Sequence, residues 1–437
     1  MSTLRDEAVR ILTRLRQAGH LAYWVGGCVR DRLLGAEPRD YDIVTDATPQ
    51  QMHSLFPHTI PVGAAFGTVL VVADSHHVEV STFRGRERTA LAAPADPAEL
   101  IRADVAHRDF TINALAADPE TDRLFDFVEG RADLDRKLIR AVGDPRRRFH
   151  EDPLRLVRAV RFAAQLGFTI EPVTEAAIRA LASDATLASP ERIHQELLAI
   201  LLSPRPTPAF RLLHDTGLLH ALLPEVAAME GVAQPPEFHP EGDVWTHTLL
   251  MLEHLSQVPG PSPELALAVL LHDVGKPLTF RVADRIRFDR HCEVGVALVE
   301  AIAARYRWSG AQTERVAALV RDHLTFLNAR AMRRSTLVRW LRQPHFPELL
   351  ELYRLDCLSS HGSLDIWEFC RDQHDALPPE QIRPPRLLTG EDLKALGYPP
   401  GPRYKEILSA VEDAQLEGAL RTPEAARAWV REHYPLA

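Results

Sequence analysis

The sequence predicts an α+β protein, with a small head of mixed sheet and helices followed by an all-helical remainder. Strand-like segments alternate with helical ones in the first third of the chain. After about residue 130 the strand patterns fade, and apolar residues recur at helical spacing instead. The chain has 437 residues, of which 46% are apolar and 25% charged, so large buried cores in more than one domain are expected.

The head is expected to begin with an amphipathic helix over residues 5–19. Four strands are predicted to follow, at 21–25, 40–44, 67–73 and 77–83. Only a short polar turn separates the last two, so they are expected to be neighbours. Residues 84–107 are rich in polar residues and are expected to form a loop that leads into a helix.

The remainder is expected to be helical. Helices are predicted at 152–166 and 190–202, because each opens with an acidic or Ser-Pro start signal and then shows an apolar stripe. The apolar run 265–271 predicts a third helix, and residues 388–408 predict a helix, a Pro/Gly turn and a helix. Pro-rich stretches predict boundaries at 203–208, 233–240 and 378–385.

Composition limits the classes of function. No apolar run approaches the length of a membrane span, and the N-terminus lacks the apolar core of a signal peptide, so no membrane partner is expected. The four cysteines are scattered without a Cys-x-x-Cys pair. This spacing argues against a zinc ribbon and a disulfide framework, and it predicts a reducing, cytoplasmic location.

The net charge of −9 disfavours a nucleic-acid partner for the chain as a whole, but one segment reverses the local balance. Ten basic residues lie between residues 131 and 161, namely Arg131, Arg136, Lys137, Arg140, Arg146, Arg147, Arg148, Arg155, Arg158 and Arg161. This density predicts a surface for a polyanion, with a solvated helix face as the alternative.

An Asp-Tyr-Asp triplet follows a glycine pair near the N-terminus. Asp40 and Asp42 are two residues apart in an extended segment, so their carboxylates point to the same face of a strand. Such a pair can hold two Mg²⁺ ions for in-line phosphoryl or nucleotidyl transfer. Gly26 and Gly27 let backbone N–H groups approach a triphosphate, and Arg30 adds charge-assisted hydrogen bonds. An isolated acidic triplet is also common in solvated turns, but the glycine lead-in favours a site.

Three further side chains are candidates for the same chemistry. Glu79, in the last predicted strand, is either a third carboxylate of the site or an exposed acid on a strand face. Asp152 and Arg155 are three residues apart at a helix start, and the simplest interpretation is a helical salt bridge. As a pair, however, Asp152 accepts hydrogen bonds and Arg155 donates them. This matches cytosine and adenine alike, because each base offers an amino donor beside a ring-nitrogen acceptor. Guanine and uracil would leave buried groups unpaired, so the pair predicts an amino-acid template for C and A.

Histidines gather in the second half of the sequence. His247, the doublet His272-Asp273, His291 and His323 fall within about eighty residues. The doublet ends an apolar helix, so its imidazole and carboxylate can share one metal with histidines from neighbouring helices. A lone helical histidine is more often structural, but four in this order favour a metal centre.

These motifs resemble those of the class II tRNA nucleotidyltransferases, the family of CCA-adding enzymes and bacterial poly(A) polymerases within the polymerase-β-like superfamily. The matching segments are 26–35 with the acidic triplet, 108–113, 151–155 and 189–197, in the family's order and spacing. The resemblance implies a nucleotidyltransferase head over 1–140, a helical neck over 141–230, an HD-type body over 231–375 and a helical tail over 376–437. It further implies addition or repair of the 3′-terminal CCA of tRNA from CTP and ATP, with the acceptor and T arms of tRNA as the bound RNA.

Roles are implied for individual residues as well. Asp40 and Asp42 would bind the catalytic Mg²⁺, with Glu79 beside them, and Asp109 would contact the ribose 2′-hydroxyl. The nucleotide would be bound by Gly26, Gly27, Arg30, Arg108, Asp109, Asn113, Asp152, Arg155 and Arg158. Position 107 departs from the family, because it is His where a second Arg is common. The 84–107 loop also lacks the family's usual pattern, so an enzyme that adds only A or only CC, or a poly(A) polymerase, stays open.

The second half resembles an HD domain, the metal-dependent phosphohydrolase fold that some bacterial CCA enzymes carry. By this resemblance a divalent transition metal would be bound by His247, His272, Asp273 and Asp356. His291 and His323 would bind phosphate or a second metal. In relatives the domain either hydrolyses 2′,3′-cyclic phosphates or serves as a scaffold. A protein that acts chiefly as an HD phosphohydrolase, with an RNA-binding head, is the alternative from another class.

Overall fold

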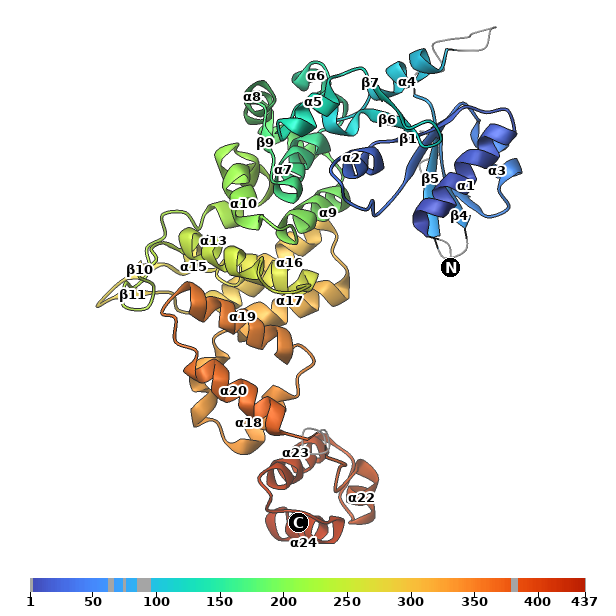
Figure 1. Ribbon diagram of the computed structural model, residues 1–437. Helices are drawn as coiled ribbons and strands as arrows, with labels where there is room; N and C mark the ends of the chain where they lie inside the picture. The colour runs from blue at the N-terminus through green and yellow to red at the C-terminus, as the bar shows by residue number, and fades with distance from the viewer. Residues whose placement is uncertain (1–2, 62–66, 74–75, 85–95, 379–383, 437) are drawn as a thin grey trace. The chain divides into compact units, whose positions relative to one another are not determined.

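The structure, a computed structural model, describes residues 3–61, 67–73, 76–84, 96–378 and 384–436. Contacts between Cα atoms divide the chain into two compact units, Met1–Leu222 (unit 1) and Leu223–Ala437 (unit 2). Unit 1 holds a mixed sheet with helices, and unit 2 is almost entirely helical, which confirms the predicted fold class (Figure 1). Among the described helices, none has the length and apolarity needed to cross a membrane.

The head is built on a seven-stranded sheet in the order β3-β4-β5-β2-β1-β6-β7. Its strands are β1 (Ala22–Val25), β2 (Asp42–Thr45), β3 (Thr59–Pro61), β4 (Thr68–Ala73), β5 (His76–Thr82), β6 (Leu115–Asp118) and β7 (Arg123–Asp126). β2 pairs with β5 in parallel, whereas the other neighbours are antiparallel. The four predicted strands are present within two residues of their expected bounds, and β3, β6 and β7 were not predicted.

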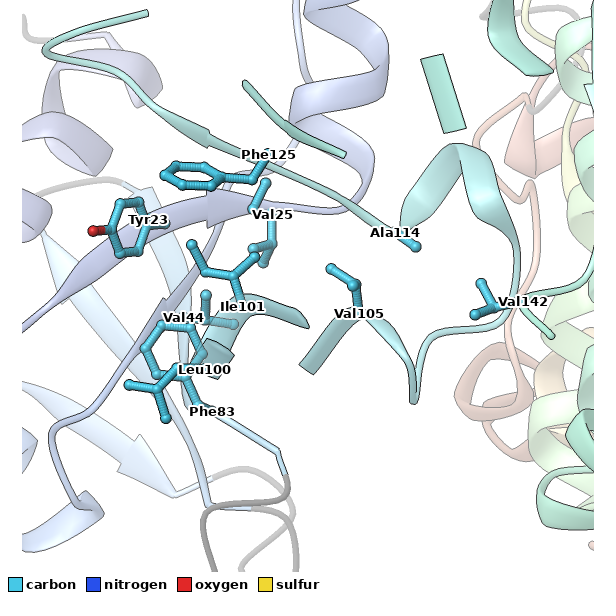
Figure 2. Close-up of a cluster of buried hydrophobic side chains, with 11 residues drawn as sticks. Tyr23, Val25, Val44, Phe83, Leu100, Ile101, Val105, Ala114, Phe125 and Val142 are labelled. Atoms are coloured by element: carbon cyan, nitrogen blue, oxygen red, sulfur yellow. The ribbon is translucent and has the colours of Figure 1, made fainter. Parts of the chain in front are cut away.

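One face of the sheet is covered by α4 (Pro97–Val105), which begins at the cap Asp96. Leu100 and Ile101 of this helix lie against side chains from the central strands, as Figure 2 shows. Tyr23 and Phe125 meet edge to face with ring centroids 5.4 Å apart. The predicted 84–107 loop therefore ends in the expected helix, and its residues 85–95 lie outside the described ones.

The other helices of unit 1 are α1 (Leu4–Gln17), α2 (Gly27–Leu33), α3 (Pro49–Leu55), α5 (Gly130–Asp135), α6 (Pro145–Glu151), α7 (Leu154–Leu166), α8 (Pro172–Ala180), α9 (Pro190–Leu201), α10 (Pro206–Asp215) and α11 (Leu218–Leu222), with the short strands β8 (Leu138–Ile139) and β9 (Thr169–Ile170). Three of these helices, α1, α7 and α9, were predicted from the sequence, and the rest were not. The boundary predicted at 203–208 is wrong. Pro206 is the first residue of α10, where proline is favoured because its fixed φ suits a helix start. The prolines therefore mark the start of a helix within unit 1, which continues to Leu222.

Unit 2 is organised around α14 (Pro263–Leu271), whose residues from Leu265 to Leu271 are all buried. Its neighbours are α13 (Val244–Leu255), α17 (Gly310–Asp322) and α19 (Phe346–Ser359). The remaining elements are α12 (Pro224–Ala227), α15 (Lys276–Thr279), β10 (Arg281–Val282), β11 (Ile286–Arg287), α16 (His291–Tyr306), α18 (Arg334–Leu341), α20 (Asp365–Ala376), α22 (Gly390–Ala395), α23 (Pro402–Leu416) and α24 (Pro423–His433). The last three surround a small core of their own, and α22 and α23 confirm the predicted helix-turn-helix.

Candidate functional site

Three carboxylates meet at the middle of the head sheet. Tyr41, which is 1% exposed, separates Asp40 from Asp42 and turns into the core, so the two acids share the outer face. Asp42 opens β2 and lies directly opposite Glu79 of β5 in the parallel pairing. Burial raises the pKa of Asp42 to about 7, helped by the negative charges of Glu79 and Asp40 and opposed by Arg108.

The glycine pair leaves room beside these acids. Gly26 has φ +77°, and a Cβ there would lie 2.9 Å from Nη1 of Arg108 and 3.5 Å from Oδ2 of Asp42. A Cβ on Gly27 would lie 3.8 Å from Oδ1 of Asp40. A side chain at either position would therefore occupy the space in front of the carboxylates.

A hydrogen-bonded chain connects this centre to α7 and α9. Nη1 of Arg30 donates to Oδ1 of Asn113 at 2.6 Å, and Nδ2 of Asn113 donates to Oδ1 of Asp109 at 3.2 Å. Oδ2 of Asp109 accepts from Nε and Nη2 of Arg158, on α7, at 2.9 and 2.7 Å. Burial alone would raise the pKa of Asp109, but the charge and hydrogen bonds of Arg158 outweigh it and hold the pKa at about 2. Arg158 then reaches Glu196 of α9 at 3.4 Å.

The two residues expected to read the base do not pair with each other. Asp152 lies before α7 in extended backbone, not in its first turn, and its Oδ2 lies 2.8 Å from Nη2 of Arg192. Arg155 contacts Glu151 at 3.3 Å and donates to the carbonyl of His107 at 2.8 Å. The predicted i, i+3 salt bridge is therefore wrong, because Asp152 and Pro153 interrupt the helix between α6 and α7. Each side chain has other partners instead.

A second centre lies in unit 2, where residues in or directly after five helices, α13, α14, α16, α17 and α19, contribute imidazole and carboxylate groups. Asp273 is at its middle, and its Oδ2 lies 3.1 Å from Nε2 of His272. Its Oδ1 lies 3.5 Å from Nε2 of His291 and 3.8 Å from Nε2 of His323. His247, the fourth histidine, is fully buried. Potential metal-binding atoms of His247, His272 and Asp273 lie within 4.8 Å of one another. The structure thus brings together the histidines that the sequence singled out.

Asp356, of α19, also joins this centre. Its Oδ1 lies 3.2 Å from Nε2 of His247. Burial disfavours a charged imidazole, but Asp356 and Glu241 together raise the pKa of His247 to about 9. Burial and the nearby His272 lower the pKa of His323 to about 4. One buried centre therefore holds a histidine whose pKa is raised and another whose pKa is lowered. This is expected where a bound cation takes the place of protons.

The Nδ1 atoms of three of these histidines are each engaged by a nearby backbone carbonyl. His272, His291 and His323 each place Nδ1 near the carbonyl three residues earlier, at 3.1, 2.9 and 2.7 Å. Since a carbonyl only accepts, Nδ1 carries the hydrogen and Nε2 is left with its lone pair. The three lone pairs face the same carboxylate, which is the arrangement that a metal requires.

Three residues at the two centres were not predicted from the sequence. Asp104 holds Arg108 through a 3.0 Å contact in the head. Glu241 accepts from Nδ1 of His247 at 2.7 Å, and Lys276 lies 2.7 Å from Asp273. The Gly-Lys that follows the doublet was a signal for Lys276. Glu241 comes directly after a Pro-rich stretch that suggested only a boundary.

Comparison with known proteins places the chain in a family. Three family models match the chain: the poly A polymerase head domain at residues 22–140, the probable RNA and SrmB-binding site of polymerase A at 167–230, and the HD domain at 244–360. The A-adding tRNA nucleotidyltransferase of Deinococcus radiodurans is 36% identical over 428 residues, covering 93% of this chain and 94% of the relative. The chain belongs to the tRNA nucleotidyltransferase and poly(A) polymerase family.

Other members of this family differ in what their names say they add. A multifunctional CCA protein of Alkalilimnicola ehrlichii is 38% identical and covers 76% of this chain and 79% of its own. The CC-adding tRNA nucleotidyltransferase of Thermus thermophilus is 34% identical, with 94% and 93% covered. Among solved structures, the Bacillus stearothermophilus CCA-adding enzyme in complex with CTP matches with a TM-score of 0.73, 28% identity and coverage of 99% and 98%.

Proposed function

We propose that this chain is a template-independent tRNA nucleotidyltransferase that adds or repairs the 3′-terminal CCA of tRNA from CTP and ATP. The observation that carries the proposal is the meeting of Asp40, Asp42 and Glu79 beside two glycines that leave the space in front of them open. In this reaction the RNA 3′-hydroxyl attacks the α-phosphate of the nucleotide, and pyrophosphate leaves. We infer a cytoplasmic location from the tRNA substrate.

The carboxylates fit divalent cations. Asp42 has its pKa raised to about 7 by burial and by two neighbouring acids, so positive charge is needed to keep the cluster ionised at neutral pH. Oxygen ligands of this kind are those that Mg²⁺ prefers. Bound at Asp40 and Asp42, Mg²⁺ would neutralise charge on the triphosphate and on the attacking and leaving oxygens. Glu79 is suited to orient the attacking hydroxyl from the neighbouring strand.

The remaining residues hold the nucleotide. Asp109 is kept ionised by Arg158, which suits it to accept a hydrogen bond from the ribose 2′-hydroxyl. Asp152 and Arg155 are proposed to read the base, as acceptor and donor, and Arg192 holds the Asp152 carboxylate through its 2.8 Å contact. We further propose the domains 1–140, 141–230, 231–375 and 376–437 as head, neck, HD-type body and tail, with the tRNA acceptor and T arms bound by the helical part.

The test uses tRNA transcripts that end before CCA, after C and after CC, each incubated with labelled CTP and ATP. Growth of all three to CCA and no further is the expected result. Extension of only the CC-ended transcript would assign the chain to the A-adding enzymes, and a stop at CC to the CC-adding ones. Absence of incorporation by the wild-type protein, or activity that survives Asp42→Ala, would contradict the proposal.

A second activity is proposed for the HD centre, namely hydrolysis of a phosphate ester. Three imidazole Nε2 lone pairs converge on Asp273, and His247 and Asp356 complete the set. Nitrogen and carboxylate ligands of this kind suit a divalent transition metal, which would activate a water for attack on phosphorus. Hydrolysis of nucleoside 2′,3′-cyclic phosphates that is lost in His272→Ala, with CCA addition retained, is the expected result. Equal hydrolysis by the variant would contradict it.

A further inference from the structure

Buried polar atoms without hydrogen-bond partners gather at the HD centre. In the described part of the chain, five of them belong to it: Gln234 Nε2, Glu241 Oε2, His247 Nε2, His272 Nε2 and Asp273 Oδ1. Each such atom costs about 1–3 kcal/mol if nothing pairs with it, so the cluster indicates a ligand. Four of the five can offer an electron pair to a cation. Gln234 Nε2 is the exception, because an amide nitrogen only donates hydrogen bonds.

Lys276 fixes the orientation of the Gln234 amide. An ammonium group only donates, and Nζ of Lys276 lies 2.7 Å from Oε1 of Gln234. The amide oxygen must therefore face Lys276, and a flipped amide would set donors against donors. Two N–H groups of Nε2 are left in an interior where Gln234 is only 4% exposed. These donors require an acceptor that the described side chains do not supply.

Lys276 also ties this amide to the candidate metal ligands. Its Nζ lies 2.7 Å from Oδ2 of Asp273 as well as 2.7 Å from Gln234. An ammonium has three N–H groups, so one remains after these two contacts. Together Lys276 and Gln234 keep three donors next to the carboxylate at the middle of the centre. A cation and a cluster of N–H donors side by side are suited to an anion that can contact both at once.

The segment that carries Gln234 is held in place on both sides. Glu241 accepts from Nδ1 of His239 at 2.8 Å and from Nδ1 of His247 at 2.7 Å. Asp243 caps α13 and also accepts from the backbone N–H of Gly231 at 2.5 Å. The Gly231–Asp243 bond joins the two ends of the 231–243 segment, and the Glu241–His247 bond ties the segment to the centre, so Gln234 has a defined place in the interior.

We propose that Gln234, together with Lys276, forms a subsite for the phosphoryl group of the substrate at the HD centre. A phosphoryl group carries several oxygens, so one can contact the cation while another accepts from the amide N–H groups. The proposal rests on the phosphohydrolase activity proposed above and adds the residue that recognises the phosphoryl oxygen. Gln234 is a binding residue here, and the cation ligands remain those described before.

Gln234→Glu is the decisive substitution. It keeps the side-chain shape and an oxygen for Lys276, but it replaces the unpaired amide nitrogen with an oxygen that repels an anion. The full-length, metal-loaded protein is titrated with inorganic phosphate in a calorimeter, and its metal content is measured in parallel. We expect phosphate to bind at least about tenfold more weakly to the variant, which is about 1.4 kcal/mol, with the metal content unchanged.

Two further variants make the result specific. Gln257→Glu adds the same charge at an exposed position after α13 and should leave phosphate affinity unchanged. Methionine is similar in size to glutamine, is uncharged and has no N–H donors. Gln234→Met should therefore also weaken phosphate binding, and it replaces Gln234→Glu if that variant loses metal or does not fold. A nucleoside 2′-monophosphate should bind wild-type protein at least as tightly as free phosphate does.

Equal phosphate affinity of wild type and Gln234→Glu, at equal metal content, would overturn the subsite. Failure of the metal-loaded wild type to bind phosphate at millimolar concentration would do the same. Weaker binding of the nucleoside monophosphate than of free phosphate would overturn the substrate role. If phosphate binding depends on Gln234 but no ester is hydrolysed, the subsite stands and the proposed phosphohydrolase activity is wrong.

Discussion

Replacing Asp109 with Asn should destabilise unit 1 by about 2–3 kcal/mol at neutral pH. The carboxylate is buried and accepts hydrogen bonds from Arg158, from Asn113 and from the backbone N–H of Phe110. Burial would raise its pKa, but Arg158 and these bonds hold the pKa at about 2 against an ordinary 3.8. At about 1.36 kcal/mol per pKa unit, the ionised form contributes about 2.4 kcal/mol to the free energy of unfolding.

The same pKa fixes how this effect depends on pH. Since the folded-state pKa is lowered, the contribution is complete above the unfolded-state pKa and is lost as the pH falls through about 2. The stability difference between wild type and Asp109→Asn should therefore narrow from about 2.4 kcal/mol at pH 7 to about 1.3 kcal/mol at pH 3.

Trp24 provides the assay, because it is the sole tryptophan of unit 1. Urea unfolding followed by ¹⁹F NMR of 5-fluorotryptophan reports on this unit separately from unit 2. Asp135→Asn is the control, since the Asp135 side chain is 65% exposed and its 3.3 Å contact with Arg131 should be worth less than about 0.5 kcal/mol. A difference below about 1 kcal/mol for Asp109→Asn at pH 7, or one that does not narrow at pH 3, would refute the reasoning.

Three other predictions follow from the two centres. Gly26→Ala should lower incorporation of labelled CTP at least about tenfold, because its Cβ would meet Arg108 at 2.9 Å and φ is +77°; normal incorporation would contradict the crowding. Arg192→Ala should reduce kcat/KM for CTP and ATP by roughly tenfold, since Asp152 loses its partner; unchanged kinetics would show that the contact is incidental. Removing bound metal with a chelator should lower the unfolding temperature of unit 2 in wild type but not in His272→Ala; equal shifts would place the metal elsewhere.

The residues with local signals were predicted well. Alternation along a strand was enough to put Asp40 and Asp42 on one face, and the apolar run before His272 predicted a buried helix. The fold class followed from the change of periodicity along the chain. Each of these inferences uses only residues that are close in sequence, where strand and helix geometry fix the side-chain directions.

The contacts that close each site could not be predicted in this way. The register that sets Glu79 opposite Asp42 depends on a parallel pairing across a long crossover, which no local pattern specifies. Arg192 reaches Asp152 from forty residues away, and the helical salt bridge was wrong because Pro153 ends α6 before α7 begins. Gln234 was not predicted, because the prolines of the 233–240 stretch indicated only a domain boundary.

The HD histidines have a consequence for how the chain acquires its metal. His272 and His323 fix Nδ1 on carbonyls of α14 and α17, and His291 fixes it on the carbonyl of Phe288 just before α16, so the local backbone sets all three tautomers. A cation therefore meets three Nε2 lone pairs that are already in place and does not have to select the tautomers. Imidazole and carboxylate ligands accept several divalent transition metals, so the ion that fills the site in a cell should depend on which metal is in supply.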